Sequence, residues 1–156
     1  MSTIMKAPAD EVFEALHDVV HLYKARRQRA IAGSGQPVSQ MEAKAVGFFG
    51  RRPGATLSDF AAHSGRDKSQ LARVIAGLRE RGLMEAREDE GDRRNIRLQL
   101  TPLGDAIHGE LRQALRKVAR EAAGGLGEAE RDKLLELLRK VGERVASEAS
   151  ASRADR

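Results

Sequence analysis

Residues 56–104, TLSDFAAHSGRDKSQLARVIAGLRERGLMEAREDEGDRRNIRLQLTPLG, decide the fold of this chain. Thr56 is followed three residues later by Asp59. This spacing is typical of a helix start, because both side chains can accept hydrogen bonds from free backbone N–H groups. The pair Ser64-Gly65 breaks this short helix. A second helix is predicted to begin at Asp67, so a tight turn joins the two.

The second predicted helix has two different faces. Its apolar residues recur every three or four positions, which places them on one side; they are Leu71, Val74, Ile75 and Leu78. The other side carries small, polar and basic residues near the N-terminal end, namely Lys68, Ser69, Gln70, Ala72 and Arg73. A helix with such groups in its first turns, braced by the helix before it, has the geometry for contacting base edges and phosphates in a major groove.

A β-hairpin is predicted after this helix, which Gly82 ends. Residues 83–87 form its first strand, and residues 88–92 are polar and rich in turn formers. The second strand follows from a two-residue alternation, with Ile96, Leu98 and Leu100 on its half-buried side. Arg93 and Arg94 lie near the tip, where guanidinium groups can enter a minor groove.

Further helices are predicted on both sides of this module. The first spans residues 10–32, with an apolar face of Phe13, Leu16, Val20 and Tyr23. Its basic run at residues 24–29 either complements the helix dipole or contacts phosphate. Residues 33–37 form a linker, and Ser39 with Glu42 makes a capping box that starts the next helix. Core packing is the expected role of the phenylalanines of this helix.

Two long helices are predicted after the hairpin. Thr101 can cap the first of them, with Pro102 at a position that needs no N–H. Its apolar stripe is Leu103, Ile107, Leu111, Leu115, Val118 and Ala122. Glycines within residues 124–127 interrupt it, and a last helix is predicted from about Glu128, with a stripe of Leu134, Leu138, Val141 and Val145. These stripes extend beyond what so small a module can cover, and a second copy of the chain would bury them.

The hairpin sequence resembles a known signature. Residues 92–104 resemble the wing of the MarR family of transcriptional regulators: an Asp-x-Arg, a short strand, then Leu-Thr-x-x-Gly. Residues 67–73 are similar to that family's recognition helix, and residues 78–83 to its helix-to-wing turn. We therefore expect a mainly α fold of the α+β winged-helix type, with six helices and a two-stranded β wing, dimerising through the N- and C-terminal helices.

The resemblance also implies a division of the chain by role. We expect an N-terminal dimerisation helix and linker at 1–36, a winged helix-turn-helix DNA-binding domain at 37–101, C-terminal dimerisation helices at 102–148 and a disordered tail at 149–156. A two-fold dimer of this kind would bind a pseudo-palindromic operator in double-stranded DNA. The family further implies a repressor that a small anionic or phenolic effector releases.

Composition limits the alternatives. The formal net charge of +5 favours a polyanionic partner, although residues 57–101 hold 9 basic and 8 acidic groups. Cysteine is absent, which excludes disulfides and thiolate metal sites. The N-terminus lacks the order of a signal peptide and no apolar run is long enough for a membrane span, so we expect a cytoplasmic protein without a membrane partner. We expect no cofactor.

DNA contacts are expected from the second helix of the module and from the wing. The candidates are Arg66, Lys68, Ser69, Gln70, Arg73, Arg93 and Arg94. Arg73 is the first choice for a base or phosphate contact, the alternative being a solvated side chain, and Gln70 can pair bidentately with adenine. Asp92 is expected to orient Arg94 through a charge-assisted hydrogen bond. The acidic run at 88–90 departs from the family pattern and argues against deep insertion of the whole tip.

Other functions leave weaker signals. His17 and His21 are four residues apart, a spacing that can hold a metal, but zinc would then need carboxylate ligands. A metal-responsive repressor is therefore an alternative, and so is a winged-helix protein-interaction module that does not bind DNA. The preferred role for these histidines, with Tyr23 and Met41, is to line an effector pocket. No nucleophile–base pair or phosphate-binding glycine loop is found, so no enzyme is expected.

Overall fold

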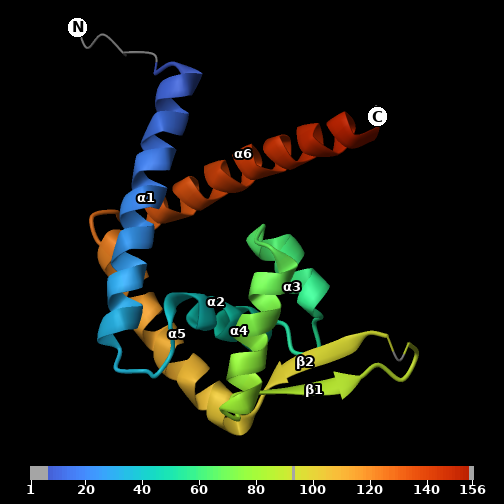
Figure 1. Ribbon diagram of the computed structural model, residues 1–156. Coiled ribbons are helices and arrows are strands. Elements are labelled where there is room, and N and C mark those ends of the chain that lie inside the picture. The colour runs from blue at the N-terminus through green and yellow to red at the C-terminus, as the bar shows by residue number, and fades with distance from the viewer. Residues whose placement is uncertain (1–6, 93, 155–156) are drawn as a thin grey trace, which may run out of the picture. The chain divides into compact units, whose positions relative to one another are not determined.

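The computed structural model describes residues 7–92 and 94–154 (Figure 1). In this part of the chain there are six helices and one antiparallel pair of strands. The elements are α1 (Ala9–Gly33), α2 (Gln40–Arg51), α3 (Leu57–Ser64), α4 (Lys68–Glu80), β1 (Met84–Glu88), β2 (Ile96–Leu100), α5 (Pro102–Ala122) and α6 (Glu128–Ala154). The predicted succession of six helices with a two-stranded wing is confirmed. No helix in the described residues has the length and apolar character that crossing a membrane requires.

The chain divides into two compact units, the first ending at Val118 and the second beginning at Ala119. The first unit contains α1 to α4, the two strands and most of α5, and the second contains the end of α5 and α6. The predicted boundaries at residues 36, 101 and 148 divide the chain by function, into dimerisation and DNA-binding segments, and not into compact units. That division stays a prediction.

Side-chain caps start four of the helices, as predicted, and the one at α5 is Thr101, whose Oγ1 accepts from the backbone N–H of Gly104 at 3.2 Å. Ser39 and Glu42 form a complete capping box at α2, and Thr56 and Asp59 form another at α3. Asp67 caps α4 by accepting from the backbone N–H of Ser69, at 3.4 Å. These bonds fix where each helix begins, because they satisfy N–H groups that have no partner inside the helix.

Three phenylalanines form the centre of the core of the first unit. The ring centroids of Phe48 and Phe49 lie 5.0 Å apart, and those of Phe48 and Phe60 lie 5.1 Å apart. All three side chains are buried, which confirms the expected core role of the α2 aromatics. The buried face of α4 packs against this cluster through Leu71, Ile75 and Leu78, and the wing contributes Leu98 and Leu100. The cluster therefore joins α2, α3, α4 and the base of the wing.

The wing is a hairpin in which Met84 pairs with Leu100 and Glu88 pairs with Ile96. Figure 1 shows it projecting from the helices of the first unit. The prediction that Ile96 belongs to the buried side of its strand is wrong, since its side chain is 49% exposed. Ile96 lies at the outer end of the hairpin, past the residues that the helices cover, so alternation alone does not bury it.

Two expectations for the C-terminal helices need correction. Leu103 is expected in the apolar stripe of α5, but its side chain is 58% exposed, whereas Ile107 and Leu111 of that stripe are buried. The last helix continues to Ala154, whereas a disordered tail was expected from residue 149. The alanines, serines and glutamate of residues 146–151 carry little penalty in a helix, so low hydrophobicity did not end it.

Exposed apolar side chains remain on a helix of each unit. In the first unit they lie on α1 and are Val12, Phe13, Val19, Val20 and Leu22. In the second unit they lie on α6 and are Leu134, Leu135, Leu137, Leu138 and Val145. Runs of large exposed hydrophobic side chains mark surfaces that bind a partner.

Gly104 explains the glycine of the wing signature. It lies in the first turn of α5, and a Cβ there would collide with the carbonyl oxygen of Leu83 and approach Leu100 Cβ to 3.3 Å. The backbone at Leu83 ends the α4-to-wing turn and cannot move without opening the hairpin. A glycine is therefore required where α5 crosses the base of the wing.

We expect Gly104→Ala to lower the free energy of unfolding by about 1–3 kcal/mol, the range for overpacking a closely packed site. Urea denaturation at fixed protein concentration measures this. Gly109→Ala is the matched control, since Gly109 lies in the same helix with no atom near its Cβ position. It should leave stability unchanged or raise it by up to about 1 kcal/mol, because alanine favours helix. Equal effects of the two substitutions would contradict the steric explanation.

Candidate nucleic-acid interface

The first turns of α4 present a polar and basic surface to solvent. The five residues predicted to contact DNA in this region are all exposed: Arg66, Lys68, Ser69, Gln70 and Arg73. The opposite face is buried against the aromatic cluster. The N-terminal end of a helix also carries partial positive charge from its backbone dipoles. This surface therefore offers hydrogen-bond donors and positive charge together.

Contacts at the start of α4 fix this surface. Gly65 adopts a left-handed conformation, with φ of 67°, and turns the chain between α3 and α4. Lys68 Nζ donates to Ser58 Oγ at 2.8 Å, which links the first turns of the two helices. Ser69 Oγ donates to an Asp67 carboxylate oxygen at 2.6 Å, and this bond holds the pKa of Asp67 below its ordinary value. The Ser69 oxygen remains available as an acceptor.

A contact that the sequence did not indicate fixes the other end of the helix. Arg81 follows α4, and its guanidinium donates to the Glu42 carboxylate and to the backbone oxygen of Pro37. Glu42 also completes the capping box of α2. The C-terminal end of α4 is thereby linked to α2. The two residues lie about forty positions apart in sequence, so motif analysis does not detect the pair.

At the tip of the wing, Asp92 and Arg94 are joined by a hydrogen bond. Arg94 is exposed, as expected for a DNA contact. Asp92, expected to orient Arg94 through a charge-assisted hydrogen bond, accepts from the backbone N–H of Arg94 at 3.0 Å. A carboxylate two residues before an N–H makes a local turn more readily than it reaches a long flexible side chain. Asp92 thus shapes the turn that presents Arg94. Arg93, also predicted to contact DNA, lies outside the described residues.

Arg97 is a further functional candidate that the sequence did not indicate. Its guanidinium donates to the backbone oxygen of Gly54 at 3.2 Å and to Asp89 Oδ2 at 3.0 Å. Asp89 also accepts from the backbone N–H of Gly91, and these bonds together hold the pKa of Asp89 below its ordinary value. Arg97 therefore connects the wing to the turn before α3.

The residues predicted to line an effector pocket occupy different environments. His17 and His21 are exposed on α1, and Tyr23 is half-buried with the Arg27 guanidinium 5.8 Å from its ring centroid. Met41 is half-buried on α2 and packs against the core. Their assignment to a pocket stays a prediction. Within residues 7–92 and 94–154, no three His, Asp or Glu side chains are arranged to hold a metal ion.

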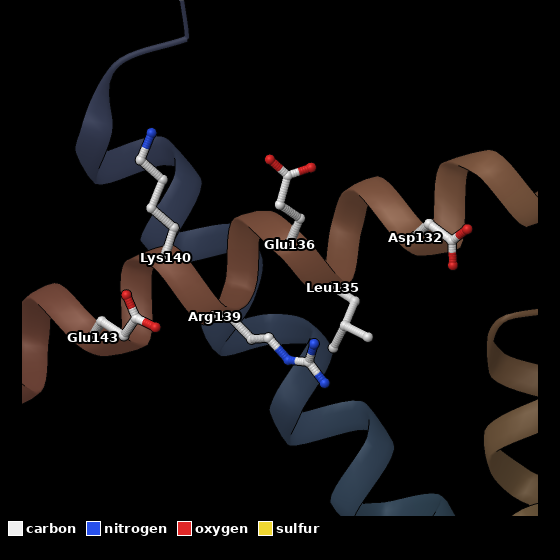
Figure 2. Close-up of a pocket in the computed structure, with 6 residues that line it drawn as sticks. All are labelled: Asp132, Leu135, Glu136, Arg139, Lys140 and Glu143. Carbon is white, nitrogen blue, oxygen red and sulfur yellow. The ribbon is translucent and has the colours of Figure 1, made fainter.

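A depression on the second unit lies wholly on α6. Figure 2 shows the side chains that line it, which are Asp132, Leu135, Glu136, Arg139, Lys140 and Glu143. Five of the six carry charge, and Glu136 is paired with Lys133 at 3.3 Å. Charged side chains of a single helix form a solvated surface, and this depression does not suit an apolar or aromatic effector.

Basic residues from three helices of the first unit gather around Arg51. Partial burial, followed by the charges of Arg52, Arg27 and Arg112, lowers the pKa of the Arg51 guanidinium. The ring of His108 on α5 lies so close to Gly50 on α2 that a Cβ there would overlap it. Burial and the charges of Arg112 and Arg51 lower the pKa of His108, with Asp105 opposing them. We call Arg27, Arg51, Arg52, His108 and Arg112 the basic cluster, and its positive charges disfavour the protonated form of His108.

The arrangement of α3, α4 and the paired strands defines a winged helix-turn-helix protein. Residues 36–95 match the family model described as MarR family. The transcriptional regulator PetP of Rhodobacter capsulatus is 36% identical over 84 residues, covering 52% of this chain and 51% of PetP. The repressor NicR of Pseudomonas putida is 25% identical over 146 residues, covering 90% of this chain and 92% of NicR. Over residues 36–95 this chain is therefore similar to the MarR family.

The solved structures agree on the fold. A mutant of Escherichia coli MarR complexed with operator DNA superposes with a TM-score of 0.65 at 20% identity, covering 86% of this chain and 99% of that one. The chain spans about half the length of the first curated relatives it matches. The relatives described above are named as regulators and repressors rather than enzymes, in agreement with the expectation that this chain is not an enzyme.

His108 gives a prediction for the pH dependence of stability. Its pKa is lowered in the folded protein, so the unfolded chain takes up a proton first as the pH falls through the ordinary value of 6.5. The contribution of neutral His108 is therefore present above that pH and lost below it. We expect thermal stability to decline as the pH falls from above 6.5 towards the lower pKa of His108 in the folded protein. The His108→Gln variant should show a smaller decline.

Thermal unfolding followed by circular dichroism at several pH values tests this. His17→Gln is the control, since His17 is exposed on α1, and the decline should persist in that variant. An unchanged decline in His108→Gln would show that other groups cause it.

Proposed function

We propose that this protein is a transcriptional regulator that binds double-stranded operator DNA as a homodimer. The observation that carries the proposal is the exposed polar and basic surface on the first turns of α4, fixed at both ends of the helix and accompanied by a wing with an exposed Arg94. Helix-turn-helix proteins place such turns in the major groove, and a wing arginine suits the adjacent minor groove. E. coli MarR, in the structure named above, is bound to operator DNA.

The exposed apolar side chains of α1 and α6 support a homodimer. A stable monomer rarely leaves so many large hydrophobic residues on two helices in water, and a second copy would cover them. Two recognition helices related by a two-fold axis lie about 34 Å apart on one face of DNA, so the operator would be a pseudo-palindrome. Acting on DNA, the protein would work in the cytoplasm.

Repression and release by an effector complete the proposal. NicR is named a repressor, and a protein that covers an operator blocks transcription by default. The basic cluster around Arg51 favours an anionic effector, because it gathers positive charge from α1, α2 and α5 within the first unit. His17, His21, Tyr23 and Met41 remain candidates for the rest of the effector site.

Arginine substitutions on α4 and the wing test DNA binding. We expect Arg73→Ala to weaken binding to the protein's own promoter region by about 1–3 kcal/mol. Arg94→Ala should weaken binding and reduce the slope of log affinity against log salt by about one, since it removes an ionic contact. Gel retardation and fluorescence anisotropy over a series of salt concentrations measure both effects.

Arg79→Ala provides the matched control, because Arg79 is an exposed arginine in the last turn of the same helix. It should bind nearly as the parent does. If the parent protein fails to retard duplex DNA at low salt, the DNA-binding proposal is wrong and a protein-interaction module is favoured.

A charge placed on the exposed apolar face of α6 tests the homodimer. We expect Leu138→Glu to convert dimer to monomer and to reduce operator binding, because burying a carboxylate in an apolar interface is costly. Lys140→Glu is the control, since it puts the same side chain at a charged position of that helix. Sedimentation velocity measures the oligomeric state, and a monomeric parent would contradict the proposed dimer.

A further inference from the structure

Arg97 occupies the joint between the wing and the helix-turn-helix. It lies on β2, and its side chain bonds in two directions: to Gly54 O, in the turn that precedes α3, and to Asp89 Oδ2, in the wing. Its side chain is 44% exposed, and that of Asp89 is 26% exposed. Both acceptors are therefore met by one planar group, which has its donors fixed in a fork.

The Gly54 side of this joint is part of the scaffold. The backbone N–H of Gly54 donates to Leu98 O, and the backbone N–H of Leu98 donates to Ala55 O, both at 2.9 Å. These bonds attach β2 to the turn before α3 at the level of the buried Leu98. Arg97 adds a side-chain bond to the same turn, one residue nearer the wing tip.

The Asp89 side of the joint organises the tip. The backbone N–H of Asp89 donates to Asn95 O at 3.0 Å, and its carboxylate accepts from the N–H of Gly91 at 3.1 Å. The backbone N–H of Asp92 in turn donates to Asp89 O at 3.2 Å, and Asp92 caps the N–H of Arg94. A short chain of bonds thus runs from the scaffold through Arg97 and Asp89 to the residue proposed to enter the minor groove.

We infer that Arg97 is a positioning residue that holds the wing at the angle from which Arg94 meets DNA; this rests on the proposed function. An isolated two-stranded hairpin is marginally stable in water, so the outer half of the wing needs support from the scaffold. The charge-assisted Arg97–Asp89 bond supplies it. Holding the tip in place before binding removes an ordering cost that would otherwise weaken the complex.

The alternative role for Arg97 is a direct contact with a DNA phosphate. A substitution of Asp89 distinguishes this role from positioning of the wing. If Arg97 contacted phosphate, removing the Asp89 carboxylate would free the guanidinium and remove a negative charge beside the DNA, so binding would tighten. If Arg97 positions the wing, the same change cuts the link and binding weakens. The two roles therefore predict opposite signs for one substitution.

Asp89→Asn is the test variant. Its remaining side-chain oxygen can still accept from Gly91, but an amide cannot replace the carboxylate for Arg97. We expect operator affinity to fall roughly 3- to 10-fold, although the wing becomes less acidic. Glu90→Gln is the matched control, because Glu90 is an exposed neighbour that loses the same charge. It should bind as tightly as the parent or more tightly.

Two further variants distinguish positioning from contact. Arg97→Lys keeps the charge but cannot present a planar fork to two acceptors, so it should also weaken binding. In a double-mutant cycle, Arg94→Ala should reduce operator affinity less on the Asp89→Asn background than in the parent. This is expected because a displaced Arg94 already contributes less to binding. Full additivity, or rescue by lysine, would overturn the inference.

Hydrogen exchange in the free protein gives a readout without DNA. Amides of residues 88–92 and 94–96 should exchange faster in Asp89→Asn and Arg97→Lys than in Glu90→Gln, while the amides of α4 keep their protection. Unchanged exchange in the wing, or Asp89→Asn binding as tightly as Glu90→Gln, would refute the positioning role. If the parent bound no DNA, the proposed function would fail while the exchange comparison still tested the link.

Discussion

The close approach of α5 to the end of the α4-to-wing turn is the constraint on which the rest of the first unit depends. Thr101 Oγ1 donates to Gly82 O at 2.6 Å, and its backbone N–H donates to Leu83 O at 3.1 Å. The N–H of Gly104 then donates to Thr101 Oγ1 at 3.2 Å, with no Cβ to hold the backbones apart. This joint closes the hairpin at its base, so α4, the wing and α5 form one unit rather than three consecutive segments.

Side chains that bond to residues far apart in the sequence hold α4 and the wing in place. Lys68 links α4 to α3 at its start, Arg81 links it to α2 at its end, and Arg97 links the wing to the turn before α3. All three are exposed basic residues whose side chains bond to other parts of the same chain. The net charge of the module is therefore a poor indicator of DNA binding, because some of its basic side chains bond to carboxylates and carbonyl groups of the same chain.

The basic cluster and the apolar face of α1 lie outside the core of the first unit. Partial burial, followed by the charges of Arg52, Arg27 and Arg112, lowers the pKa of the Arg51 guanidinium. The apolar residues of α1 are exposed to water.

The sequence by itself determined the order of elements, the capping boxes at Ser39 and Thr56, the buried face of α4 and the wing signature, because each depends on residues within a few positions of one another. Tertiary structure decided the exposure of Ile96 and the roles of Arg81 and Arg97. Periodicity cannot tell how far the helices cover a strand, and spacing cannot reveal a partner forty residues away. Those outcomes depend on where packing of the aromatic cluster brings distant backbone groups together.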